Sequence, residues 1–378
     1  MIKIAFFASA FINRNAAGTA QVIRKMVEYL LVHESKRFNT CLITRNIDEV
    51  RKIQNDPILS RVSIISLPEV KGKFLRTSRQ YYKYSLINRR EPFDILFISV
   101  ARVFPFYWFF PAKKFHCLFY AGGEITAPTD KFILSRSVFN FIMKAQWKHL
   151  DSIFAISDFG QKEISINYRI PLSKISIIPI GADHLWNLES SKIQIRRDVF
   201  NIVVMGRWQL YKNVHSVLLA IAHSSKIDLR KIHIILLGKS HKTGFELVTR
   251  ALSQIPRDKV TILEYVTDNE LKYLYSSANL VIHPSINEGF GLPAFEAYGE
   301  GIPIAIHQGT PAAENLNGEP GVLITNMLDF TKIEETIIKS LNIEFESIER
   351  RREYLRDKSM TWNHMCRSYV DYFVKNHQ

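Results

Sequence analysis

Hydrophobic and polar positions along the chain alternate between two periods. Short apolar runs are separated by longer stretches in which apolar residues recur every three or four positions, as in 19–34 and 131–150. The first pattern predicts buried strands and the second predicts amphipathic helices. In the first half of the chain the predicted strands are 2–8, 39–44, 61–66, 94–99, 115–120, 152–156 and 175–178.

The same alternation restarts after a polar segment, 181–198. The predicted strands of this second series are 201–205, 232–237, 260–263, 280–283, 304–306 and 322–324, and helices 346–358 and 362–375 follow them. Apolar strands that alternate with helices predict parallel sheets covered on both faces. The fold class is therefore α/β, with two Rossmann-like, doubly wound parallel-sheet domains. We expect them to cover 1–182 and 183–360, to face a cleft between them, and to be followed by a last helix, 361–378.

Composition places the chain among globular proteins. Its 378 residues are 47% hydrophobic and 23% charged, and its first residues resemble a strand more than a signal peptide. The longest apolar stretch, 103–111, falls far short of the roughly 20 residues that a membrane-spanning helix needs. Three scattered cysteines (Cys41, Cys117, Cys366) predict neither a disulfide framework nor a zinc site. We expect a cytoplasmic protein.

The positive charge is confined to one half of the chain. Residues 1–180 hold 27 Lys and Arg against 13 Asp and Glu, whereas residues 181–378 hold 23 of each. The positive electrostatic field of this half favours anionic partners such as phospholipid head groups or a phosphorylated substrate. Seven basic residues between 71 and 90 form either a solvated helix face with a loop, or a patch that binds a membrane surface or an anionic acceptor. No motif for nucleic-acid binding accompanies them, so nucleic acid is not an expected partner.

The aromatic run 104–110, followed by Lys113 and Lys114, has two interpretations. It is either a buried crossover helix with Pro105 near its first turn, or an anchor at a membrane interface. The second interpretation adds peripheral association with the cytoplasmic face of an anionic inner membrane. The histidines, including His184, lack the spacing of metal ligands and are interpreted as structural or exposed.

The strongest chemical signal is the segment from Glu288 to Glu296. It follows a predicted strand and opens a helix near Leu292. Gly289 and Gly291 allow the backbone to approach a ligand closely, and a helix N-terminus attracts a pyrophosphate. Glu288 can accept hydrogen bonds from sugar hydroxyls, and Glu296 can reach the hydroxyls of a ribose.

A second signal follows the first strand of the second series, where Arg207 and Lys212 occur. When the bond to a diphosphate leaving group breaks, negative charge grows on the phosphate, and fixed cations stabilise it. Arg207 offers a planar fork and Lys212 a mobile point charge. The sequence contains no Asp-x-Asp pair. We therefore expect no metal and no other cofactor.

These two segments carry a resemblance to a known family. Residues 288–296 resemble the E-x7-E motif of retaining GT-B glycosyltransferases, family GT4, and Gly206-Arg207 with Lys212-Asn213 resembles its GR…KN pattern. The resemblance implies a metal-independent hexosyltransferase that moves a sugar, with retention, from a UDP- or GDP-sugar to a saccharide or lipid-linked acceptor. It further implies surface polysaccharide or lipopolysaccharide biosynthesis. Arg207, Lys212 and Glu288 would be catalytic, and Gly289, Phe290, Gly291, Leu292 and Glu296 would bind the donor.

Weaker resemblances extend over the rest of the chain. Tyr265 and Val266 match the segment that contacts the nucleotide base, and Gly18 matches a loop glycine that faces the donor phosphates. Relatives carry a histidine after the strand matching 115–120, where this chain has Tyr-Ala-Gly-Gly-Glu. Either Glu124 takes over a catalytic role there, or the glycines widen the pocket. Trp362 resembles a signature that precedes a helix returning to the first domain.

Competing functions make different demands on the sequence. A nicotinamide oxidoreductase should carry G-x-G-x-x-G after a first strand, and neither Ala8 nor Met205 is followed by one. A sugar-nucleotide epimerase of the GT-B shape would convert its substrate without an acceptor. A non-catalytic family member would use the fold to bind or regulate a partner. The last two stay open as alternatives to the transferase.

Overall fold

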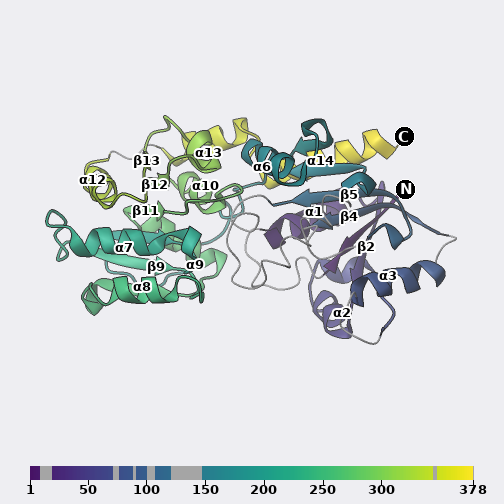
Figure 1. The fold of residues 1–378 in the computed structure, drawn as a ribbon, viewed down its shortest axis with the longest axis horizontal. Coiled ribbons are helices and arrows are strands. Elements are labelled where there is room, and N and C mark those ends of the chain that lie inside the picture. The colour runs from purple at the N-terminus through teal and green to yellow at the C-terminus, as the bar shows by residue number, and fades with distance from the viewer. Residues whose placement is uncertain are drawn as a thin grey trace. The chain divides into compact units, whose positions relative to one another are not determined.

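The computed structural model describes residues 1–8, 19–70, 76–87, 91–99, 107–120, 147–343 and 347–377. They fall into two compact units. Unit 1 takes the described residues up to 180 together with the C-terminal helix that begins at Trp362, and unit 2 takes Gly181–Thr361. Each unit is built around its own sheet (Figure 1).

The described part of unit 1 contains a seven-stranded parallel sheet with the order β3-β2-β1-β4-β5-β6-β7. The strands are β1 (Ile2–Phe7), β2 (Phe38–Thr44), β3 (Ser63–Ser66), β4 (Phe93–Ser99), β5 (Ala112–Phe119), β6 (Ser152–Ala155) and β7 (Ile175–Ile177). Strand β1 pairs with β2 on one side and β4 on the other, so the order reverses there. This reversal is typical of a doubly wound sheet.

Helices cover this sheet. They are α1 (Thr19–His33), α2 (Ile47–Gln54), α3 (Arg76–Ile87), α6 (Asp158–Tyr168) and α14 (Trp362–His377), with short 3-10 turns η2 (Leu59–Arg61), η3 (Tyr107–Phe109), η4 (Trp147–His149) and η5 (Leu172–Lys174). Helix α14 contacts α1. Its buried side chains Tyr369 and Phe373 pack on Phe97 of β4 and Phe154 of β6. The C-terminal end of the chain is therefore part of the core of unit 1.

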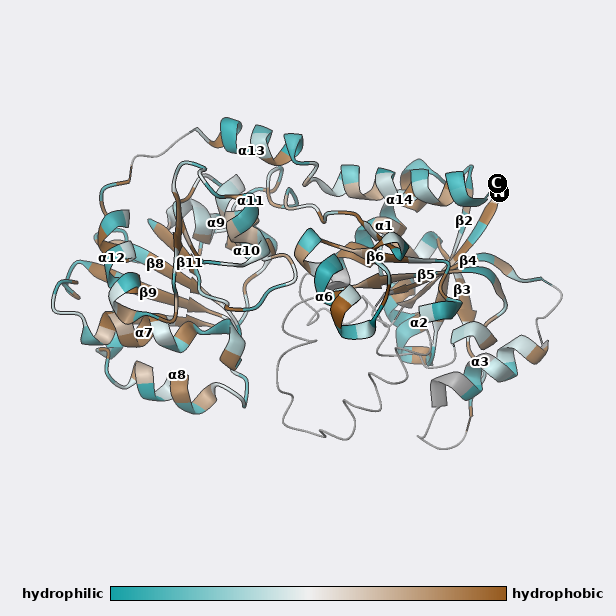
Figure 2. Ribbon diagram, turned by 45° about the horizontal axis from the view of Figure 1, so that its top comes forward, coloured by the Kyte–Doolittle hydropathy of each residue, from teal (hydrophilic) through white to brown (hydrophobic). Residues whose placement is uncertain are grey.

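Unit 2 contains, among its described residues, a six-stranded parallel sheet with the order β10-β9-β8-β11-β12-β13. The strands are β8 (Phe200–Met205), β9 (Ile232–Leu237), β10 (Val260–Leu263), β11 (Leu280–His283), β12 (Ile304–His307) and β13 (Val322–Thr325). The order reverses at β8, which pairs with β9 and β11. Figure 2 shows apolar strands between helices that carry polar residues on their outer sides.

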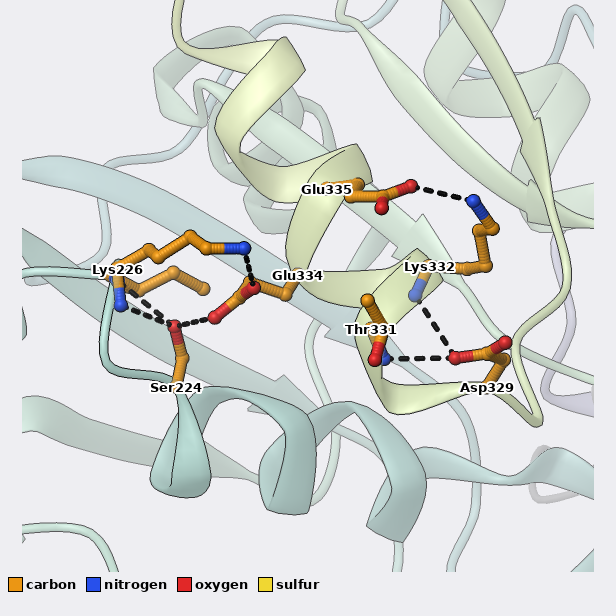
Figure 3. Close-up of polar contacts among 8 residues, drawn as sticks. Ser224, Lys226, Asp329, Thr331, Lys332, Glu334 and Glu335 are labelled. Atoms are coloured by element: carbon orange, nitrogen blue, oxygen red, sulfur yellow. Dashed lines mark hydrogen bonds and ion pairs between the residues drawn. The ribbon is translucent and has the colours of Figure 1, made fainter.

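The helices of unit 2 pack on this sheet and on one another. They are α7 (Val214–His223), α8 (Phe245–Leu252), α9 (Asp268–Ser277), α10 (Leu292–Gly299), α11 (Pro311–Asn315), α12 (Phe330–Ser340) and α13 (Ile348–Asp357), with 3-10 turns η6 (Leu210–Lys212) and η7 (Arg257–Lys259). Polar contacts fix α12 against α7. Glu334 accepts from Ser224 and Lys226, and Asp329 caps the helix start by accepting two backbone N–H groups (Figure 3).

The structure confirms all thirteen predicted strands, with ends that move by at most three residues, and confirms the two doubly wound parallel sheets. The largest shift is at β5, which begins at Ala112 because Ala112 already pairs with Phe93. The predicted helices 19–34, 346–358 and 362–375 correspond to α1, α13 and α14. A further helix was expected over 131–150. Most of it lies outside the described residues, and its end is the 3-10 turn η4.

The aromatic run does not form the expected crossover helix where it is described. Tyr107–Phe109 is a single 3-10 turn, and β5 follows within three residues. Tyr107 and Phe110 are buried, whereas Phe109 is 39% exposed. Because β5 begins so soon after this 3-10 turn, no helix fits between the turn and the strand. Within the described parts of the chain, no helix combines the length and apolar character needed to cross a membrane.

Candidate active site

The candidate site is built at the carboxyl ends of β8 and β11, which are neighbours where the order of sheet 2 reverses. Val203 of β8 lies opposite Val281 of β11, so the segments after the two strands leave the same edge of the sheet. Arg207 follows β8 and is exposed. The Tyr211 carbonyl accepts the Ile286 N–H at 2.9 Å, which ties η6 to the loop after β11. Ligands bind open α/β sheets at such a reversal point.

Lys212 and Glu288 form an ion pair at this edge. The Lys212 ammonium donates to the Glu288 carboxylate, and the two side chains are only 19% and 14% exposed. His283, at the end of β11, places its Nε2 atom 3.1 Å from the same carboxylate oxygen. Burial raises the pKa of Glu288, but Lys212 and His283 outweigh it and hold that pKa well below its ordinary value. Glu288 is therefore ionised over the whole physiological range.

Asn213 fixes the backbone that carries Lys212. Its φ of 53° is left-handed, a conformation that asparagine tolerates better than most residues. The buried Asn213 side chain donates to the Met327 carbonyl at 2.7 Å and accepts from Ser216 at 2.6 Å. The asparagine of the GR…KN pattern thus locks the turn between η6 and α7, and so positions the lysine before it.

A glycine outside the predicted set supports Arg207. Gly238 follows β9, and a Cβ atom added there would lie 2.2 Å from the Gly206 carbonyl oxygen and 2.9 Å from the Arg207 nitrogen. Two backbones thus touch directly where the cation-bearing segment leaves β8. Any side chain at 238 would displace Gly206 and Arg207.

Segment 288–296 turns into α10 as expected. Gly291 precedes the first helical residue, Leu292, with a φ of +88°, and an added Cβ would lie 2.9 Å from the Ala312 methyl group. Phe290 is buried against Phe295, with ring centroids 4.6 Å apart. The N-cap residue Gly291 contributes no side-chain cap to this helix. The positive end of a helix suits an anion.

Glu296 lies inside α10 and has different partners from Glu288. The Tyr275 hydroxyl donates to its carboxylate at 3.4 Å, and His184 Nε2 lies 3.6 Å from its other oxygen. Burial raises the pKa of Glu296, and His184 opposes this only in part. The sequence alone gives no signal that His184 contacts Glu296. That contact forms because the segment after Gly181 folds back onto unit 2, where the Ala182 N–H donates to the Met360 carbonyl at 3.0 Å.

The remaining predicted residues lie elsewhere. Tyr265 and Val266 occupy the loop between β10 and α9, and Tyr265 is 72% exposed. Glu270 nearby closes a capping box with Thr267, donor-to-acceptor distances being 2.7 and 3.3 Å. Gly18 and Glu124 lie outside the described residues. The structure thus brings Lys212 and Glu288 together, and adds His283 to them.

The family model described as glycosyl transferases group 1 matches residues 187–358, which contain this whole cluster. This part of the chain is thus similar to the glycosyl transferases group 1. The chain is also 27% identical over 226 residues to the O-antigen chain mannosyltransferase RfbU of Salmonella typhimurium, a match that covers 60% of each chain. It therefore spans about three fifths of that relative's length.

Solved structures share the fold. Sucrose-phosphate synthase from Thermosynechococcus elongatus is 16% identical with a TM-score of 0.71, over 99% of each chain. Anabaena HepE in complex with UDP is 13% identical with a TM-score of 0.66, over 99% of this chain and 100% of HepE. The predicted GT-B fold is confirmed, and the match of residues 187–358 supports the predicted family. The retaining outcome stays a prediction.

Proposed function

We propose that this chain is a hexosyltransferase that moves a sugar from a nucleoside-diphosphate donor to a saccharide or lipid-linked acceptor in surface polysaccharide biosynthesis. The observation that carries the proposal is the ion pair of Lys212 with Glu288 at the reversal point of sheet 2, beside the start of α10. Lys212 and Arg207 would stabilise the charge that grows on the leaving diphosphate. The ionised Glu288 would accept a hydroxyl of the transferred sugar.

The similar proteins support two candidate donors. RfbU is named a mannosyltransferase, which supports GDP-mannose, while the UDP in the HepE complex supports a UDP-sugar. The two cations would supply the positive charge that a divalent metal supplies in other transferases.

Nucleotide binding tests the proposal directly. We expect UDP or GDP, but not both equally, to raise the melting temperature, and the shift to persist in EDTA. A ligand at 100 times its Kd stabilises by about 2.7 kcal/mol. Thermal unfolding with UDP, GDP, ADP and dTDP is the measurement. If none of the four nucleotides shifts the unfolding transition, the assignment of the donor site is wrong. Conversion of the donor without an acceptor would instead identify an epimerase.

A lipid-linked acceptor would bring the protein to the cytoplasmic face of the inner membrane, and one surface of unit 1 supports this part of the proposal. Tyr82 and Leu86 of α3 are 51% and 52% exposed, and the Tyr82 ring lies 5.8 Å from that of the exposed Phe109. Lys83, between them on α3, is exposed as well. Aromatic residues beside lysines suit an anionic membrane interface.

Replacing Leu86 with serine should weaken binding to vesicles that contain phosphatidylglycerol, because an apolar contact with the interface is lost. Co-sedimentation with such vesicles, and with phosphatidylcholine alone, measures it. Ile166→Ser is the matched control, since Ile166 is 77% exposed on α6 of the same unit. Equal losses in the two variants, or no binding by the unmodified protein, would remove the membrane from the proposed function.

A further inference from the structure

The cation that the proposed function assigns to the donor diphosphate already has an anionic partner in the protein. Lys212 donates to Glu288, and the pair is mostly removed from water. The Lys212 ammonium also lies 5.2 Å from the centre of the Tyr211 ring. A diphosphate that binds Lys212 must therefore replace a carboxylate, and does not meet an unpaired ammonium.

The strength of this pair follows from its surroundings. Attraction between opposite charges grows as water is excluded, and a buried ion pair is costly to break when one partner is left alone. His283 lies against the same Glu288 oxygen, so Lys212 and His283 both contact the carboxylate there. The lysine side is the mobile one, because its four-carbon stem can swing the ammonium to a ligand nearby. We therefore expect Lys212 to exchange from Glu288 to phosphate by rotation of its side chain.

We propose that Glu288 is an internal counter-ion of Lys212 that the donor diphosphate displaces. This inference rests on the proposed function. When a nucleotide sugar binds, the sugar hydroxyls replace the hydrogen bonds that Glu288 loses. A nucleoside diphosphate product offers no such hydroxyls, so Glu288 returns to Lys212 and weakens the hold on the product. The ion pair thereby favours donor over product at one site.

The test is the affinity for the product alone. Glu288→Gln keeps the shape of the side chain and removes its charge, so we expect UDP or GDP to bind about tenfold more tightly, which is about 1.4 kcal/mol. Titration calorimetry at fixed salt measures both nucleotides. Glu288→Asp, which keeps the charge but shortens the reach, should give a smaller gain and serves if the glutamine variant fails to fold.

Two controls isolate the cause. Glu300→Gln removes another buried carboxylate of unit 2, one that pairs with Arg352 at 3.0 Å, and should leave nucleotide affinity unchanged. In a Lys212→Ala background, Glu288→Gln should lose most of its effect, because the counter-ion acts through that lysine. Such a double-mutant cycle separates the counter-ion effect from direct repulsion between Glu288 and phosphate.

The outcomes are distinct. One outcome is that the unmodified protein binds UDP or GDP while Glu288→Gln binds the same nucleotide equally or more weakly. In that case the counter-ion proposal is overturned and the proposed function stands. An equal gain with and without Lys212 overturns it as well. If no form of the protein binds either nucleotide, the proposed function fails, and the counter-ion fails with it.

Discussion

Replacing Lys212 with alanine is expected to slow sugar transfer by about 100- to 1000-fold, the usual effect of removing one group that stabilises charge in a transition state. The loss should appear in kcat as well as in KM, because Lys212 binds the donor diphosphate and also opposes the further charge that grows as the bond to it breaks. Glu288 would then lie in the site without its cationic partner. Initial rates at saturating donor and acceptor measure the effect.

A matched lysine provides the control for this experiment. Lys226 also pairs with a glutamate of unit 2, Glu334, at 2.9 Å, but Lys226 lies in the segment after α7 and Glu334 lies on α12 (Figure 3). Lys226→Ala should retain the unmodified rate, since surface pairs contribute little. Transfer by Lys212→Ala at the rate of Lys226→Ala would show that Lys212 has no part in the reaction.

The sequence predicts the strands well because most of them are short and continuously apolar, which is what a parallel sheet buried on both faces requires. The start of β5 is the instructive exception. Lys113 and Lys114 interrupt the apolar pattern, yet both lie in the strand, where they pair with Asp94 at 2.7 Å and Asp151 at 3.5 Å. Such partners come from neighbouring segments of the sheet, so the pattern of one strand does not reveal them.

The site was predictable to the extent that it depends on strand ends. Lys212 and Glu288 follow strands that any doubly wound sheet places side by side, so their proximity follows from topology. The contacts of Glu296 were not predictable in this way. His184 reaches it from a polar segment with no regular period, and such a segment gives no signal of where it folds. The role of Glu270 is different, because it forms the capping box of α9 with Thr267, a contact that is local in sequence.

The attachment of α14 should carry much of the stability of unit 1. Phe373 is 1% exposed, and its ring centre lies 5.8 Å from that of Phe97 and 5.4 Å from that of His116. Truncating such a residue removes apolar burial and leaves a cavity, so Phe373→Ala should lower the free energy of unfolding by about 3–5 kcal/mol. Chemical denaturation followed by circular dichroism measures the change.

The control compares a buried with an exposed apolar side chain in the same unit. Ile166→Ala on α6 should change the free energy of unfolding by no more than about 0.5 kcal/mol, because Ile166 is 77% exposed. A loss for Phe373→Ala as small as that of Ile166→Ala would mean that α14 is only loosely attached. Contact with both Phe97 of β4 and Phe154 of β6 argues for the larger loss. A helix from the last residues of the chain then completes a core begun by the first strands.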